Sequence, residues 1–404
     1  MNIRILPNIN LLLMLIFTAL AIFTPVYNYQ TMVNLLAVFA AWFLTAVTID
    51  KQWLSGNTKY FLIFAGIIIL DYIIGVSNND GQAMLDGINK MPIYCWVFFY
   101  LFYSKNLYRP KLVVCTIFTL LIISSYFTIK GNIEIPGASR LLAGSMEVFA
   151  DKRELVRSMN IGGYDLIYAL AFLTLPLMLW GKANKRRLML CYSLFAIFLV
   201  TVVLGAYMIG ILIMIALFAV SFLNMAEIKI GRLVIIMVIG FLLKDTFLDI
   251  IGSVGEQYDI AALSRHAEEL ETGSYGQGDK YNNRWYIYLG AIQNWLQSPL
   301  FGQLFNRPEN LARSGHSELL GYMEKYGIFC LVYVAYFKAY YKNVISSYIT
   351  AEAKKAFVIL FSVFIVFGII DRFDRFCGIG FMIFFFAPYL ILLRDREKSN
   401  NITT

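Results

Sequence analysis

Long apolar segments recur along the chain and constrain what it can fold into. Each is about as long as a helix needs to cross roughly 30 Å of hydrocarbon, where only helices or closed barrels satisfy the backbone. The sequence predicts twelve spans, at roughly 8–25, 31–49, 60–76, 91–104, 111–129, 164–181, 188–204, 206–223, 233–250, 326–341, 355–370 and 377–393. Of the 404 residues, 59% are hydrophobic and 15% charged, against about 45–50% and about 25% in soluble domains. An all-α polytopic membrane protein is therefore predicted, and a soluble enzyme or a nucleic-acid-binding module is excluded.

The connections between these spans predict an orientation and three parts. Most basic loop residues fall on the side that also holds both termini, which places that side in the cytoplasm by the positive-inside rule. Two long loops, at about 131–163 and 251–325, lie on the other side. We divide the chain into a bundle of about nine helices (1–250, including the loop 131–163), a large outer loop (251–325), and three last helices with a cytoplasmic tail (326–404).

The large outer loop contains one helical pattern, at 284–297. Asn283 is a plausible N-cap and Pro299 a stop. Six apolar residues recur at helical spacing on one face: Trp285, Tyr288, Leu289, Ile292, Trp295 and Leu296. A face rich in Trp and Tyr is typical of the membrane–water boundary. The sequence therefore predicts an interfacial helix, with packing against the bundle as the alternative.

Two ionisable residues are candidates for chemistry on their position alone. Ser314 or Ser317 can cap a helix that contains His316 in its first turn, where the helix dipole favours a neutral imidazole able to accept a proton. A capping or packing histidine is the alternative. Asp71 lies within the third span, and an intramembrane carboxylate is a functional candidate by default, although it could be an interfacial group near the outer end.

The residues around this loop resemble a known family. An arginine-led helix from Asn283-Arg284-Trp285 is followed by the turn Ser298-Pro299-Leu300-Phe301-Gly302, by Gly315-His316-Ser317-Glu318-Leu319, and by Glu324-Lys325-Tyr326-Gly327 before a membrane span. This order and spacing over about 100 residues resemble the superfamily of O-antigen ligases and O-antigen or capsule polymerases. The rest of the chain matches that superfamily only in hydropathy.

The resemblance implies a membrane-embedded glycosyltransferase of the GT-C type in a bacterial inner membrane, with its active site facing the periplasm. Such enzymes invert the anomeric centre without a metal ion or cofactor. Their donors are oligosaccharides on undecaprenyl diphosphate. A polymerase joins lipid-linked repeat units, and a chain-length regulator protein is a possible partner; a ligase transfers the glycan to lipid A–core.

One departure from the family favours the polymerase. Many ligases carry an arginine that holds diphosphate in the outer turn between the seventh and eighth spans, whereas this turn reads Leu204-Gly205-Ala206-Tyr207. The family's His-Asn pair is also His316-Ser317 here. Four arginines are candidates for the missing phosphate contact: Arg140, Arg265, Arg372 and Arg375.

The chemistry of the reaction assigns roles to these residues. Charge builds on the diphosphate as the glycosidic bond breaks, and arginines complement it bidentately. We expect Arg284 on the donor diphosphate and His316 as the base for the acceptor hydroxyl. Four residues are expected as further substrate contacts: Arg265, Arg140, Arg372 and Arg375. Glu318 could orient the acceptor.

Each of these roles has a structural alternative, and the function has a competing class. Arg140 could merely neutralise Glu147 or touch lipid headgroups. The competing class is a flippase for lipid-linked oligosaccharides. Transporters tend to show internal repeats and charged or broken spans near the midplane, and the sequence has no convincing repeat. The sequence therefore favours the enzyme.

Overall fold

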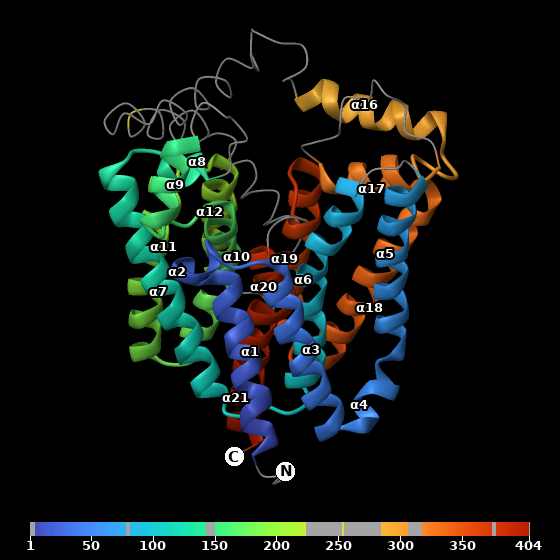
Figure 1. Cartoon of the computed structure of the whole chain (residues 1–404). Coiled ribbons are helices and arrows are strands. Elements are labelled where there is room, and N and C mark those ends of the chain that lie inside the picture. Colours follow the sequence, from blue (N-terminus) through green and yellow to red (C-terminus); the bar gives the residue numbers. More distant parts are fainter. Residues whose placement is uncertain are drawn as a thin grey trace.

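Helices make up nearly all of the secondary structure. The computed structural model (Figure 1) describes residues 5–77, 81–142, 150–223, 253, 284–305, 317–373 and 377–403, and these residues contain no β-strand. Seven of the described helices are long and apolar enough to cross a membrane: α3, α5, α7, α10, α11, α19 and the helix that begins at Cys377. Their length and composition make the chain an all-helical protein suited to a bilayer.

The helix bounds follow the apolar segments. In chain order they are α1 (Leu6–Ile22), α2 (Thr24–Tyr27), α3 (Met32–Ile49), α4 (Lys51–Gly56), α5 (Thr58–Ser77), α6 (Gly81–Tyr103), α7 (Pro110–Glu134), α8 (Ala138–Leu141), α9 (Ala150–Ser158), α10 (Tyr164–Gly181), α11 (Lys185–Leu204), α12 (Met208–Ser221), α16 (Arg284–Gln297), α17 (Glu318–Tyr326), η2 (Gly327–Cys330), α18 (Leu331–Ser347), α19 (Ala351–Ile370), α20 (Cys377–Phe381), the π-helical turn η3 (Met382–Phe386) and α21 (Ala387–Thr403).

Every predicted span except 233–250 overlaps one or more of these helices, and 233–250 lies outside the described residues. The total of twelve crossings stays a prediction. The span expected at 326–341 begins later, because α17 ends at Tyr326 and α18 starts at Leu331. Gly327 between them has φ +54°, a left-handed conformation that interrupts the helix. The loop expected at 131–163 is partly helical, since α7 runs to Glu134 and α8 and α9 follow.

Two helical segments form the centre of the bundle. In the apolar windows of α10 and of the last helix, 89% of the residues are buried, against 17% in α3. The last helix contributes a continuous aromatic core, in which the rings of Phe381 and Phe386 stack at 5.5 Å. The outer helices present apolar side chains outward instead, for example Leu44 on α3, which is 66% exposed. Such faces suit contact with lipid.

The two ends of the bundle differ in what they carry. The start of α1 and the end of α21 lie at one end, which we call the inner end (Figure 1). Helices α8, α9, α16 and α17 lie at the opposite end, which we call the outer end, and α16 lies across it (Figure 1). These names follow the side that the sequence predicts for each end.

Candidate functional site

Arg140 lies at the turn between α11 and α12. Its guanidinium carbon is 6.0 Å from the ring centroid of Tyr207, the last residue of that turn. The Tyr207 hydroxyl donates a hydrogen bond of 2.7 Å to the carbonyl of Ser139, next to Arg140. A cation from α8 therefore occupies the turn that has none in its own sequence.

A second group of polar residues joins α10 to the connection after α19. The Tyr168 hydroxyl on α10 donates to Oδ2 of Asp371 at 2.9 Å. Oδ1 of Asp371 accepts from the backbone N–H of Arg372 at 2.8 Å, and the carbonyl of Asp371 accepts from the N–H of Glu318 at 3.3 Å. The side chains of Arg372 and Glu318 form an ion pair, with Nε and Oε2 3.7 Å apart. The Glu318 side chain is only 3% exposed.

These two groups are continuous. The ring of Tyr168 lies 6.2 Å from that of Tyr207, and Tyr164 lies against Tyr207 at 3.9 Å. We call the connected set the outer cluster, which consists of Arg140, Tyr168, Tyr207, Glu318, Asp371 and Arg372. It brings three of the predicted site residues into one contact network from α8, α17 and the α19–α20 connection.

The start of α17 corrects one expectation. Ser317 is the N-cap, and its hydroxyl accepts from the N–H of Leu320 at 3.3 Å. Because the first turn of α17 begins at Glu318, the prediction that His316 lies within that turn is wrong, and the dipole argument for its neutral form loses its basis. His316 itself lies outside the described residues, one peptide bond before a buried cap in contact with Gly368.

Helix α16 is attached to α17 and to the end of α19. Oε1 of Glu324 on α17 accepts from the side-chain amides of Asn294 and Gln303, both at 2.9 Å. The Tyr288 hydroxyl donates to the carbonyl of Ile370 at 2.7 Å, next to the outer cluster. Arg284 begins α16 one turn before Tyr288. The backbone of α16 thus carries Arg284 close to the chain segment that holds Asp371 and Arg372.

The described residues of the apolar face predicted for this helix are exposed or partly buried. Three of them, Leu289, Ile292 and Leu296, are exposed by 37% to 62%, and Tyr288 and Trp295 are partly buried, whereas the buried Ala291 lies outside that face. Packing against α17 and an outward apolar face therefore coexist. The exposed leucines remain available for the interfacial contact that the sequence predicts.

Two glycines of the family-like motifs meet face to face. Gly302 has φ +56° and Gly327 has φ +54°. A Cβ on Gly327 would lie 2.5 Å from the carbonyl oxygen of Leu300, and a Cβ on Gly302 would lie 2.6 Å from the backbone nitrogen of Gly327. Backbone hydrogen bonds on either side join Gln303 to Lys325 and Ile328 to Leu300. These motifs therefore encode a close backbone crossing that fixes the end of α16 on α17.

A buried ion pair lies beneath α17. The ammonium of Lys90 on α6 is 4.0 Å from Oδ1 of Asp71 on α5, with side chains 4% and 8% exposed. The Tyr326 hydroxyl donates to Asp71, and the Lys90 ammonium lies 5.8 Å from the ring centroid of Tyr322. Both tyrosines belong to α17. Sequence analysis noted Asp71 but missed Lys90, whose position just outside the span expected at 91–104 was the available signal.

Another buried carboxylate has a structural role. Asp165 in the first turn of α10 is 5% exposed, and Oδ1 accepts from the N–H of Gly378 at 2.7 Å. The Tyr27 hydroxyl donates to its other oxygen. A Cβ on Gly378 would lie 2.8 Å from the carbonyl oxygen of Asp165. The hydrogen bond from Gly378 and this close approach fix the start of α20 against α10. The position of Asp165 within an apolar span was the sequence signal that was missed.

The predicted site residues thus fall into three groups. Arg140, Glu318 and Arg372 belong to the outer cluster. Arg284 is described as the first residue of α16, without its side chain. His316, Arg265 and Arg375 lie outside the described residues, as does Asn283. Within the described part of the chain, no three His, Cys, Asp or Glu residues are arranged to hold a metal ion.

Comparison with known proteins adds no relative to this picture. No model of a protein family matches the chain, and no curated protein matches it. The sequence and the fold together define an all-helical protein whose described helices include seven that are long and apolar enough to cross a membrane.

Proposed function

We propose that this chain is an O-antigen or related polysaccharide polymerase. It is a GT-C-type glycosyltransferase that joins undecaprenyl-diphosphate-linked repeat units at the periplasmic face of a bacterial inner membrane. The observation that carries the proposal is the outer cluster, which gathers Arg140, Arg372 and Glu318 beside the helix that follows His316. The same cluster adjoins α16, which begins with Arg284.

The position of Arg140 accounts for the departure from the family pattern. Relatives of the kind that the sequence resembles carry a diphosphate-binding arginine in the turn between the seventh and eighth spans. Here Arg140 reaches the corresponding turn from α8 and lies over Tyr207. In this proposal Arg140, on a different helix, takes the role of that turn arginine. The lack of an arginine in the turn sequence therefore no longer distinguishes a polymerase from a ligase. The polymerase is favoured only by the His316-Ser317 pair, which replaces the His-Asn pair of the family.

The reaction proceeds by a single displacement. The acceptor hydroxyl attacks the anomeric carbon of the donor sugar, the bond from that carbon to the diphosphate oxygen breaks, and the configuration inverts. His316 takes the hydroxyl proton, and undecaprenyl diphosphate leaves with the electron pair. Arg284 and Arg140 stabilise its developing charge, because guanidinium groups bind phosphate oxygens bidentately.

Glu318 and Arg372 serve the acceptor side in this proposal. Glu318 is buried and paired with Arg372, whose side chain is 21% exposed. A carboxylate held in this way accepts hydrogen bonds from sugar hydroxyls, and the partly exposed guanidinium donates to them. Their attachment to Asp371 fixes their position relative to Tyr168 and α10.

Two alternatives are separated by one genetic experiment. The lipopolysaccharide of a strain that lacks the gene is compared on a gel with that of the same strain carrying a plasmid copy. A polymerase predicts core with a single repeat, and a ladder restored by the plasmid. Bare core with glycan held on the lipid carrier would indicate the ligase. An unchanged ladder would refute a role in O-antigen assembly and direct the test to capsule or exopolysaccharide.

Substitutions in the restored copy test the residue assignments. His316→Ala and Arg284→Ala should each abolish long-chain product, because removing a group that acts in the transition state costs about 10²–10³ in rate. Protein abundance, measured by immunoblotting of membranes, should stay at the wild-type level. A normal ladder from either variant would overturn that residue's assignment.

A further inference from the structure

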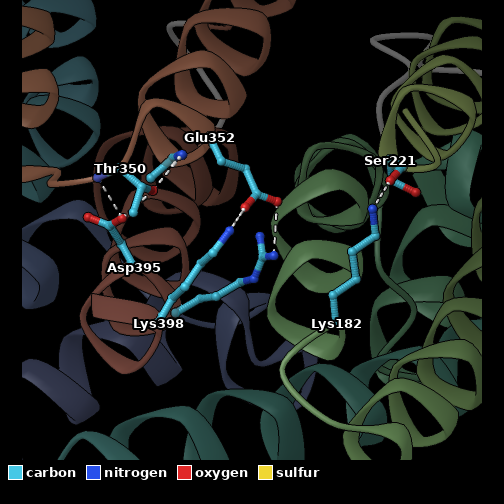
Figure 2. A network of polar contacts seen from close by, with 8 residues as sticks. Lys182, Ser221, Thr350, Glu352, Asp395 and Lys398 are labelled. Atoms are coloured by element: carbon cyan, nitrogen blue, oxygen red, sulfur yellow. Dashed lines mark hydrogen bonds and ion pairs between the residues drawn. The ribbon is translucent and has the colours of Figure 1, made fainter. Parts of the chain in front are cut away.

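Polar networks lie at both ends of the bundle, and the charges of the inner one are paired within the chain itself (Figure 2). Glu352 at the start of α19 binds Arg394 and Lys398 of α21, both at 2.9 Å. Asp395 of α21 accepts hydrogen bonds from the backbone N–H and the hydroxyl of Thr350. These contacts hold the end of α21 against the start of α19, which gives the inner network a structural role.

The outer cluster differs because it adjoins a partly exposed aromatic ring. Tyr164 is the first residue of α10, and its ring centroid lies 3.9 Å from that of Tyr207 and 5.7 Å from that of Tyr168. The rings of Tyr164 and Tyr168 stack, with their planes 24° apart. Tyr168 and Tyr207 are 1% and 3% exposed, whereas Tyr164 is partly exposed. Tyr164 is therefore the ring of this group that a ligand can reach.

The backbone at the start of α10 is held on both sides of Tyr164. Before it, the N–H of Gly162 donates to the hydroxyl of Thr128 on α7 at 2.8 Å. After it, Asp165 accepts from the N–H of Gly378 at 2.7 Å. A ring on a backbone fixed in this way loses little freedom when a ligand binds, which favours affinity.

Charged groups lie on two sides of Tyr164. One neighbouring ring, that of Tyr207, has the guanidinium of Arg140 6.0 Å from its centroid. The other neighbour, Tyr168, donates to Asp371 at 2.9 Å. Arg140 and Asp371 are both partly exposed. In this chain of contacts, Tyr164 lies between the cation proposed for the diphosphate and the segment that carries a residue proposed for the acceptor.

A sugar ring fits a site of this composition. The C–H groups on one face of a pyranose pack against the electron-rich face of an aromatic ring, while the hydroxyls at its edge need polar or charged partners. In the proposed reaction, the sugar bonded to the diphosphate lies between the phosphate contacts and the acceptor hydroxyl. Tyr164 occupies the corresponding place in the chain of contacts.

We propose that Tyr164 stacks against the sugar that is bonded to the donor diphosphate. The inference rests on the proposed function, which supplies the glycan donor. It assigns Tyr164 to recognition of the sugar, whereas arginines bind phosphate whichever sugar follows. Tyr164 would then help to set which first sugar is accepted, because an axial hydroxyl on the stacking face holds a sugar away from the ring.

The test compares two ligands that differ by the glycan. Native mass spectrometry of the detergent-purified full chain measures the binding of undecaprenyl-diphosphate-linked repeat units and of undecaprenyl diphosphate alone. The wild-type protein should prefer the glycan-bearing lipid. Tyr164→Leu should lower that preference about tenfold, the upper range for one stacked ring, and leave the affinity for undecaprenyl diphosphate unchanged. Tyr164→Phe should keep the preference, because the ring remains.

A matched control removes a tyrosine from a different surface. Tyr126 on α7 is 60% exposed, and Tyr126→Leu should leave the binding of both lipids unchanged. An equal loss of both lipids in Tyr164→Leu would indicate a packing role and overturn the proposal, as would an unchanged preference or a Tyr164→Phe variant as impaired as Tyr164→Leu. If Tyr164→Leu does not fold, the same prediction applies to Tyr164→Met, whose flexible side chain refills the space without a ring.

The wild-type protein separates failure of this inference from failure of the proposed function. If it binds neither lipid, the proposed function is refuted. If it binds both lipids with equal affinity, the proposed function stands and the sugar contact of Tyr164 is overturned.

Discussion

Gly327→Ala should break the attachment of α16 to α17. Gly327 adopts φ +54° and ψ −134°, a region that costs a side-chain-bearing residue about 1–3 kcal/mol. The added Cβ would lie 2.5 Å from the Leu300 oxygen and 2.7 Å from the Gly302 nitrogen. Both are backbone atoms, so rotation of a side chain cannot relieve the contacts, and the two segments must separate.

The hydrogen bonds weakened by this separation set how much stability Gly327→Ala removes. Moving the segments apart weakens the hydrogen bonds from Gln303 to Lys325 (2.9 Å) and from Ile328 to Leu300 (3.2 Å), each worth about 1 kcal/mol. Together with the backbone strain, Gly327→Ala should lower the free energy of unfolding by about 3–5 kcal/mol. Glycan polymerisation should also be lost, because α16 carries Arg284, the proposed contact to the donor diphosphate.

The assay is unfolding in mixed micelles followed by circular dichroism, and Gly290→Ala is its control. Gly290 lies in the middle of α16, and a Cβ there would meet no atom within 4 Å. Removing glycine from a helix interior should stabilise it by about 0.5–1 kcal/mol. If Gly327→Ala proved as stable as Gly290→Ala, the backbone crossing would not hold α16, and this reasoning would be refuted.

Substitutions at four further residues test the network around the outer end. Arg140→Gln should slow chain extension about 10²–10³-fold at unchanged abundance, with Arg140→Lys less severe; equal rates on a gel time course would exclude a phosphate contact. Glu324→Ala should destabilise the protein by about 1–2 kcal/mol by leaving two partly buried amides without an acceptor, and Glu324→Gln by less, as micellar unfolding would show. Asp71→Asn or Lys90→Met alone should cost about 3 kcal/mol, and the double change should recover most of it; additive losses would mean that the pair is not coupled.

Most of the long apolar helices were predictable from sequence, because the length of an apolar segment indicates where a chain can cross a bilayer, whereas the short helices α4, α8 and α9 were not predicted. The helix at 284–297 was predicted from the helical spacing of its apolar residues and from Pro299 as its stop. The start of α18 was missed, because Gly327 looks like any glycine until its left-handed conformation and its contact with Gly302 are known. Hydropathy cannot report a positive φ.

The site was only partly predictable, because its residues come together through tertiary contacts. Arg140 is 67 residues from Tyr207 in the sequence, and no local pattern could place it at the α11–α12 turn. Tyr168 gave no signal, since a tyrosine in an apolar span reads as core. Its hydrogen bond to Asp371 spans 203 residues. The first-turn position of His316 was misjudged because two serines could each cap the helix.

Helix α17 connects the buried Lys90–Asp71 ion pair to the outer cluster. Tyr322 and Tyr326 of α17 contact the buried Lys90–Asp71 pair below, while Glu318 at its start joins the outer cluster above. An unpaired charge in this environment is costly, so the pair strongly favours one position of α17. The same helix holds α16 through Glu324. The elements that carry Glu318 and Arg284 are therefore fixed to one buried support.

The central claim is that this protein itself transfers lipid-linked glycan. The most direct measurement incubates the detergent-purified protein with undecaprenyl-diphosphate-linked repeat units and follows glycan length by mass spectrometry. The account predicts units of two or more repeats and the release of undecaprenyl diphosphate, without a sealed membrane and with loss of both in His316→Ala. Repeat units that stay single with the folded wild-type protein, while a sealed-vesicle assay shows them crossing the bilayer, would contradict the account and indicate a flippase.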